Sequence, residues 1–213
     1  MLVRHRGHDP VVDPSAFVAP TATLVGDVRV GPRARVMYGA VLDAEASQVE
    51  VGECAIVCEH AVLRATAAGG ISRPVVLADH VLVGPHATLL GCRVERCAYL
   101  ATGATVLQAA RIGAGGSIAV GALVHAGAVV PDEFFVPPNM VAVGDPIQVV
   151  PTDDPRALAE AVRSTGFARL AFGVEADWED RIARYEQTAE VRSAEFAEHA
   201  DDVVLPPAEE PTP

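Results

Sequence analysis

The chain has 213 residues and a formal net charge of −12, with 28 acidic side chains against 16 Lys and Arg. This balance argues against nucleic acid or an anionic membrane surface as a partner, because both require a basic face. Half of the residues are hydrophobic but only 5% are aromatic, which suits a repetitive core of small and branched side chains. No apolar run approaches the roughly 20 residues of a membrane span, so we expect no membrane segment.

The N-terminal stretch "MLVRHRGHDP" carries positive charge, but no apolar segment follows it. It therefore does not have the pattern of a secretory signal, and we expect a cytoplasmic protein with reduced cysteines. The cysteine spacings, C-x3-C and C-x4-C, do not match the usual pairs of zinc ribbons. We predict no metal at the four cysteines, which are Cys54, Cys58, Cys92 and Cys97.

A branched apolar residue recurs at every sixth position from Leu24 to Val130, with three slips. In most repeats a small residue follows four positions later. A helix would show a period of 3.6 and an isolated strand a period of 2, so a period of six indicates neither. The pattern predicts a solenoid in which each hexapeptide forms one short strand and one turn. Two of the slips, at 43–50 and 65–76, predict loops outside the coils.

This repeat resembles that of the hexapeptide-repeat proteins, whose fold is a left-handed parallel β-helix. We therefore expect a mainly β fold, with the solenoid over residues 1–150 and a helical segment over 151–200. Asp154 is a suitable N-cap before Pro155 for a first helix. A second helix is expected over about 178–199, with four apolar residues loosely facing inward: Ile182, Tyr185, Val191 and Phe196. The Pro- and Glu-rich tail, 201–213, is expected to be disordered.

Four stretches carry a closer resemblance: "DPSAFVAPTATLVGDVRVGPRARVMYGAVL" (13–42), "VGECAIVCEHAVLRAT" (51–66), "VGPHATLLGC" (83–92) and "AVGDP" (142–146). Over roughly residues 8–150 the chain resembles the γ-class carbonic anhydrases. The resemblance implies a homotrimer with a metal ion at each subunit interface. In that family three histidines hold the ion, two from one chain and one from its neighbour.

The resemblance also implies that the metal site has been lost. The same-chain histidines of the family align with Arg64 and Leu90, and the neighbour-chain histidine aligns with Pro85. None of these side chains is a metal ligand, and the fixed charge of Arg64 repels a cation. We therefore expect no metal and no cofactor, and no carbonic anhydrase activity, because that chemistry needs a metal to activate water.

Other motifs of the family differ as well. An Arg-Gly-Asp segment that helps to tie the trimer reads Asp43-Ala44-Glu45 here, and a Gln-Asp pair reads Cys58-Glu59. The loop that carries an acidic proton shuttle in the type member reads "ATAAGGISRP" and contains no acid.

The inter-subunit cleft that the resemblance implies can still bind a ligand or catalyse a reaction without the metal. Arg64 offers a rigid, charged fork that suits carboxylate or phosphate, with His60 and Glu45 as further ligand-binding candidates. Glu59 and His86 are placed so that they can approach Arg64 of a neighbouring chain, which makes the three residues catalytic candidates for acid–base work. The alternatives are an intersubunit ion pair between Arg64 and Glu59, and a surface ladder formed by the stacked His60 and His86.

The remaining histidines carry weaker signals. His80 shares a column with Cys54 and Cys97, which is typical of solvent-facing corners as well as of a metal site. His125 is similar to the base of hexapeptide acyltransferases, although no acyl-CoA loop is evident. Three histidines lie in terminal segments and carry no signal: His5, His8 and His199.

Three functions therefore stay open. The first is a metal-free trimer that is structural or binds a small anionic metabolite at Arg64. The second is a metal-independent enzyme that acts on a carboxylate-bearing metabolite in the same cleft. The third is an acyltransferase that uses His125 as its base.

Overall fold

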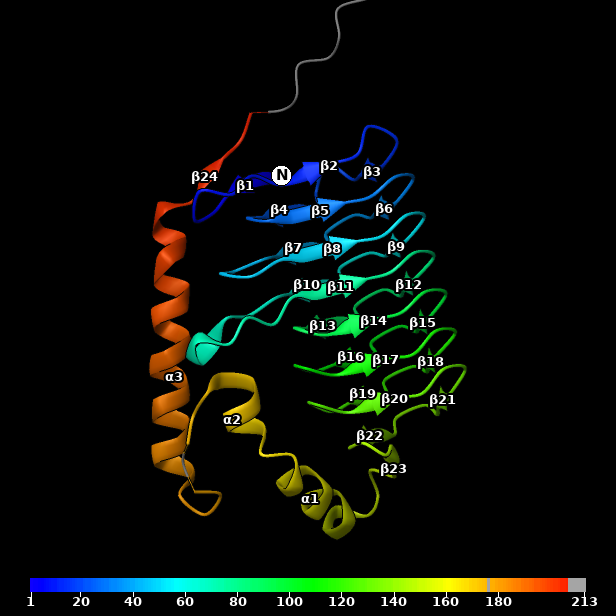
Figure 1. Cartoon of the computed structure of the whole chain (residues 1–213), viewed down its shortest axis with the longest axis vertical. Helices are drawn as coiled ribbons and strands as arrows, with labels where there is room; N and C mark the ends of the chain where they lie inside the picture. The colour runs from blue at the N-terminus through cyan, green and yellow to red at the C-terminus, as the bar shows by residue number, and fades with distance from the viewer. Residues whose placement is uncertain (176, 207–213) are drawn as a thin grey trace, which may run out of the picture.

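The structure is a computed structural model that describes residues 1–175 and 177–206. Short parallel strands stack coil upon coil into a three-sided β-solenoid, and helices follow it in the chain (Figure 1). The predicted mainly β, hexapeptide-repeat fold is confirmed. Within the described part of the chain, no helix combines the length and the apolarity that crossing a membrane requires.

Ten strands form the largest of the three sheets. In spatial order they are β23 (Gln148–Val150), β22 (Val141–Val143), β19 (Leu123–Val124), β16 (Thr105–Val106), β13 (Thr88–Leu90), β10 (Val62–Arg64), β7 (Val41–Asp43), β4 (Thr23–Val25), β1 (Leu2–Arg4) and β24 (Val203–Val204). The neighbours pair in parallel, except for β22 with β23 and β1 with β24, which are antiparallel. The two antiparallel pairs close the ends of this sheet.

The other two sheets have seven parallel strands each. The second sheet contains β2 (Val11–Val12), β5 (Val28–Val30), β8 (Val49–Val51), β11 (Val75–Leu77), β14 (Arg93–Val94), β17 (Arg111–Ile112) and β20 (Val129–Val130). The third contains β21 (Phe135–Val136), β18 (Ser117–Ile118), β15 (Tyr99–Leu100), β12 (Leu82–Val83), β9 (Ile56–Val57), β6 (Arg35–Val36) and β3 (Phe17–Val18).

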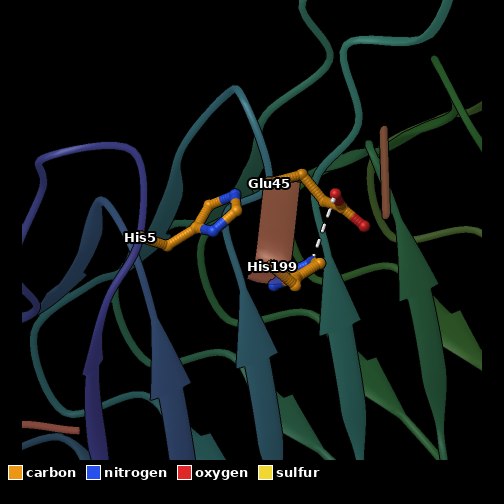
Figure 2. A group of neighbouring side chains, drawn as sticks. All are labelled: His5, Glu45 and His199. Atoms are coloured by element: carbon orange, nitrogen blue, oxygen red, sulfur yellow. Dashed lines mark ion pairs between the residues drawn. The ribbon is translucent and has the colours of Figure 1, made fainter. Parts of the chain in front are cut away.

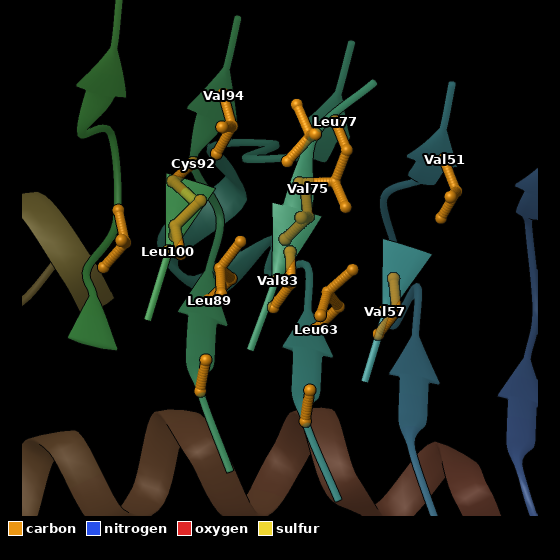
Figure 3. Packing of buried hydrophobic residues seen from close by; sticks show 14 of the residues in the cluster. Val51, Val57, Leu63, Val75, Leu77, Val83, Leu89, Cys92, Val94 and Leu100 are labelled. Carbon is orange, nitrogen blue, oxygen red and sulfur yellow. The ribbon is translucent and has the colours of Figure 1, made fainter. Parts of the chain in front are cut away.

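The six-residue period sets the core. Leu63 pairs with Leu42 on one side and with Leu89 on the other, and all three side chains are fully buried. Figure 3 shows how such residues from successive coils fill the interior of the solenoid. Because each coil buries its apolar residues mainly against its neighbours, stability is close to a sum of nearest-neighbour contributions.

The corners explain where several polar residues of the repeat lie. His60 and His86 adopt left-handed backbone with φ of 56° and 58°, and each precedes a buried alanine, Ala61 or Ala87. Histidine, asparagine and glycine tolerate this conformation better than branched residues do. A histidine at such a corner is therefore expected from turn geometry alone, with no catalytic role required.

Three α-helices follow the last coil: α1 (Pro155–Ser164), α2 (Phe167–Phe172) and α3 (Arg181–Ala197). The predicted cap of α1 is confirmed, because the Asp154 side chain accepts a 3.0 Å hydrogen bond from the Ala157 N–H. The short helix α2 was not predicted. Helix α3 runs back beside the solenoid from the last coils to the first (Figure 1).

Two expectations about this C-terminal part are wrong. Ile182 and Tyr185 on α3 do not face inward, since they are 74% and 63% exposed. The tail is not disordered from residue 201, because a 3₁₀ turn, η2 (Glu198–Asp201), leads into strand β24, which pairs with β1. The remainder of the expected disordered tail, residues 207–213, lies outside the described residues.

Candidate functional site

Arg64 lies at the end of β10, in register with Asp43 of the preceding coil and Leu90 of the following one. The predicted column of Arg64 and Leu90 is thereby confirmed. The guanidinium Nε lies 3.3 Å from Asp43 Oδ2 and 3.6 Å from Glu45 Oε1. Arg64 is therefore partnered by carboxylates of its own chain, one at the end of β7 and one in the loop that follows it.

The loop between β7 and β8 turns Glu45 into the interior. The Asp43 side chain accepts a 3.0 Å hydrogen bond from the Glu45 N–H, and Glu45 adopts left-handed backbone with φ of 48°. Both carboxylates are buried, at 3% exposure each. Burial raises the pKa of the Glu45 carboxyl above its ordinary value, and the nearby Asp43 charge acts in the same direction.

Helix α3 covers this group of charges. Arg192 Nη2 lies 3.5 Å from Glu45 Oε1, and the Arg192 guanidinium also pairs with Glu195. The Phe196 ring stacks beneath both arginines, with its centroid 5.2 Å from the Arg64 Cζ and 4.3 Å from the Arg192 Cζ. These contacts combine cation–π attraction with ion pairing. They dock α3 on the coil that carries Arg64.

The outward loop after β10 contains the 3₁₀ helix η1 (Ala68–Gly70) and contacts α3. The Glu195 carboxylate accepts a 3.2 Å hydrogen bond from the Ala67 N–H. The loop 65–74 is thus fastened to α3 and does not stand open beside Arg64.

Beside this group, two histidines share one carboxylate. His5 Nδ1 lies 2.6 Å from Asp202 Oδ1, and His199 Nδ1 lies 2.9 Å from Asp202 Oδ2. The two imidazole rings are stacked with centroids 4.3 Å apart. His199 Nε2 also lies 3.6 Å from Glu45 Oε2 (Figure 2).

The charges of this group alter the acid–base behaviour of His199 and Asp202. Burial acts to lower the pKa of the His199 imidazole, but its hydrogen bond to Asp202 and the nearby carboxylate charges together outweigh this effect and leave the pKa raised. The charges of the two buried carboxylates, Asp43 and Glu45, act in the same direction. Burial acts to raise the pKa of Asp202, yet the hydrogen bonds from His199 and His5, together with the charges of the two histidines, leave it lowered.

The other predicted site residues lie apart from this group. The His86 N–H donates to the Glu59 carbonyl at 3.0 Å, so the two residues occupy adjacent coils. His60 and His86 are exposed and stacked, with ring centroids 5.3 Å apart. Among the described residues, Arg64 of the same chain forms no hydrogen bond or ion pair with Glu59 or His86. The proposed catalytic trio depends on a neighbouring chain and stays a prediction.

The remaining candidates have ordinary structural settings. His80 and Cys97 are exposed corner residues with φ of 60° and 59°. His125 is buried beneath α2, where its ring meets the edge of Phe167 at 5.4 Å. Burial lowers the pKa of His125, which would suit a base. However, a side chain with 4% exposure has little access to an acyl donor.

The residues that align with the metal ligands of the resembled family do not fit a metal. Arg64 already faces two carboxylates, and it has no lone pair to donate. Pro85 and Leu90 are half-buried and offer no donor atom in their side chains. We therefore derive no step through a metal at these three positions.

Sequence reasoning missed the contributions of both termini. The sequence gives no signal for His5 or His199, which lie in terminal segments, yet the structure brings both against Asp202. The signal available was slight. A pair of β-branched residues before Pro-Pro in "DDVVLPP" favours a short edge strand, but nothing in it indicates β1 as its partner.

The comparisons with known proteins agree with the fold. No protein-family model matches the chain. It is 32% identical to γ carbonic anhydrase 2, a mitochondrial protein of Arabidopsis thaliana, over 68% of this chain and 53% of that protein. It is 40% identical to γ carbonic anhydrase 3 of the same organism, over 49% of this chain and 43% of that protein. The chain thus spans about half the length of the curated relatives it matches.

Among solved structures, a hexapeptide transferase family protein from Anaplasma phagocytophilum superimposes with a TM-score of 0.59 at 23% identity. The match covers 91% of this chain and 97% of that one. It supports the fold alone. The chain is therefore a hexapeptide-repeat β-solenoid protein. Its curated relatives are γ carbonic anhydrases and γ-carbonic-anhydrase-like proteins.

Proposed function

We propose that the protein is a γ-carbonic-anhydrase-like homotrimer that holds no metal at the interface positions of the family and does not hydrate CO₂ there. The observation that carries the proposal is the chemistry of Arg64, Pro85 and Leu90, which offer no ligand atom. A zinc-bound hydroxide needs about three protein ligands and an open coordination position. A cytoplasmic location is part of the same proposal.

Arg64 then serves as a charged anchor for α3. Its two carboxylate neighbours, Asp43 and Glu45, come from the same chain, and Phe196 covers its guanidinium. The Asp43 and Glu45 carboxylates are buried, and a buried charge is costly when its partner is removed. The anchor role therefore accounts for Arg64 without a ligand.

A small anionic or carboxylate ligand at Arg64 is the second form of the proposal. One observation favours it: the Arg64 side chain is about a third exposed. An incoming anion must compete with two buried carboxylates, which makes this form the weaker one. The enzyme that joins Arg64 to Glu59 and His86, and the acyltransferase that uses His125, have no comparable support.

The assembly is tested by multi-angle light scattering of the full chain, which is expected to give three times the chain mass of 22.2 kDa. The interface is tested by the triple variant Arg64→His, Pro85→His and Leu90→His. If those positions meet at a family-like interface, the variant binds one more zinc ion per chain than the wild type. A monomer mass, or an unchanged zinc content, would contradict the proposal.

A further inference from the structure

Three metal-binding side chains from distant parts of the sequence meet under the end of α3. His5 follows β1, Glu45 follows β7, and His199 lies in η2. One potential ligand atom of each residue lies within 4.8 Å of those of the other two. Figure 2 shows the three side chains gathered beside the first coils of the solenoid. The group does not involve Pro85 or Leu90.

Asp202 fixes the chemical form of both histidines. Its two oxygens accept from Nδ1 of His5 and Nδ1 of His199, so in the neutral form each ring carries its proton on Nδ1 and has a lone pair on Nε2. This is the arrangement in which a carboxylate orients and strengthens histidine ligands of a metal. His5 Nε2 is buried and has no hydrogen-bond partner among the described residues. Its lone pair therefore lacks the partner that a buried polar atom normally has.

The two oxygens of Glu45 are divided between two sets of neighbours. Oε1 faces the guanidinium groups of Arg64 and Arg192, at 3.6 and 3.5 Å. Oε2 faces His199 Nε2 at 3.6 Å. The arginines therefore leave one oxygen of Glu45 directed toward the histidines.

The charge of the group suits a divalent cation. With neutral histidines, four carboxylates face two guanidinium groups, which leaves two negative charges in a largely buried volume. The carboxylates are Asp43, Glu45, Glu195 and Asp202, and the guanidinium groups are those of Arg64 and Arg192.

We propose that His5, Glu45 and His199 bind a divalent transition-metal ion such as Zn²⁺ or Co²⁺, through the Nε2 atoms and Oε2, with Asp202 as the carboxylate that orients both histidines. Two imidazoles and a carboxylate are ligands that such ions accept. Binding requires the stacked rings to turn so that both lone pairs point toward Glu45. The ion would tie η2 and β24 to the first coils, a structural role beyond the proposed function.

The test is a titration of the untagged, chelator-treated full chain with Co²⁺, followed by visible absorption. We expect one ion per chain, with the stronger visible absorption of four- or five-coordinate Co²⁺ in place of that of the six-coordinate aqua ion. The variants Glu45→Gln and His199→Asn should each weaken binding at least tenfold, and Asp202→Asn should weaken it 10- to 100-fold. The matched control is His60→Asn with His86→Asn, which removes the other stacked histidine pair and should leave binding unchanged.

Circular dichroism of each metal-free variant establishes that it is folded, and Glu45→Gln keeps the volume of the side chain that it replaces. Wild-type protein that binds no Co²⁺ or Zn²⁺ overturns the proposal. So does binding that survives Glu45→Gln and His199→Asn but is lost in the His60 and His86 control. Neither result bears on CO₂ hydration, so a failure here is distinguishable from a failure of the proposed function.

Discussion

The Nδ1 atom of His5 lies 2.6 Å from the Oδ1 atom of Asp202, a residue 197 positions further along the chain. This contact joins the first coil to the segment that follows α3. The antiparallel pairing of β1 with β24 lies beside it. The return of the chain to its first coil is therefore held by backbone pairing and by a charged side-chain contact.

Asp202→Asn should lower the stability of this closure. The substitution removes a charged acceptor shared by two histidines, and hydrogen bonds to charged groups contribute about 1.5–3 kcal/mol. We expect the free energy of unfolding in urea to fall by roughly this amount. Asp201→Asn changes the exposed neighbouring residue and is the matched control. Equal stability of the two variants would show that the Asp202 contacts contribute nothing.

Gly173 and Gly69 make a backbone contact that permits no side chain. A Cβ on Gly173 would lie 2.8 Å from the Gly69 Cα, and Gly173 has a φ of 69°. Gly173→Ala should therefore separate the loop around η1 from α2 and lower the melting temperature. Gly166→Ala is the control, since Gly166 has a similar φ of 57° but nothing within 4 Å of its Cβ position.

The control variant should lose only about 1–2 kcal/mol, the cost of left-handed backbone for a residue with a Cβ. A larger loss for Gly173→Ala, measured by thermal unfolding, would then be due to the clash. The contact between the two glycines is unimportant if both variants melt at the same temperature.

The cysteines should react unequally. Burial raises the pKa of the Cys92 thiol to about 12, whereas Cys97 is exposed. Because the thiolate is the reactive form, iodoacetamide at neutral pH should modify Cys97 and leave Cys92 intact in the folded protein. Peptide mass spectrometry reads the two sites separately. Equal labelling of both cysteines without denaturant would mean that the interior near β14 opens readily.

His125 should make the protein sensitive to mild acid. Burial lowers its pKa in the folded state below the ordinary value of about 6.5, so the unfolded chain binds the proton first. The stability that the neutral ring contributes is fully present above about pH 6.5 and is lost as the pH falls toward the folded pKa. His125→Leu continues a column of leucines. This variant should show a weaker dependence of the free energy of unfolding on pH between about pH 7 and pH 5.

The measurement is urea unfolding of the wild type and His125→Leu at several pH values, with exposed His80→Asn as the control. If the free energy of unfolding of His125→Leu falls with decreasing pH as steeply as that of the wild type, other groups cause the acid sensitivity.

The coils were predictable because the repeat is local. One branched residue in six must point inward, and once the slips at 43–50 and 65–76 are placed as loops, this spacing stacks Leu63 on Leu42 and Leu89 and puts Arg64 between Asp43 and Leu90. Turn chemistry similarly accounts for His60 and His86 at left-handed corners. These relationships follow from spacing, so a single sequence is sufficient to predict them.

The contacts of α3 were not predictable in the same way. Its apolar residues do not form a clean stripe, since Ile182 and Tyr185 are exposed, and its docking depends on Arg192 and Phe196. A pairing between residues such as His5 and His199 depends on how the whole helix lies along the solenoid. No local pattern encodes that placement.

The measurement that tests the proposed function most directly is the rate of CO₂ hydration by the 213-residue chain, supplied in turn with Zn²⁺ and Co²⁺. We predict a rate equal to that of buffer without protein under both conditions, because Arg64, Pro85 and Leu90 cannot bind the ion that activates water. A catalysed rate that a chelator abolishes and the added ion restores would contradict the proposal.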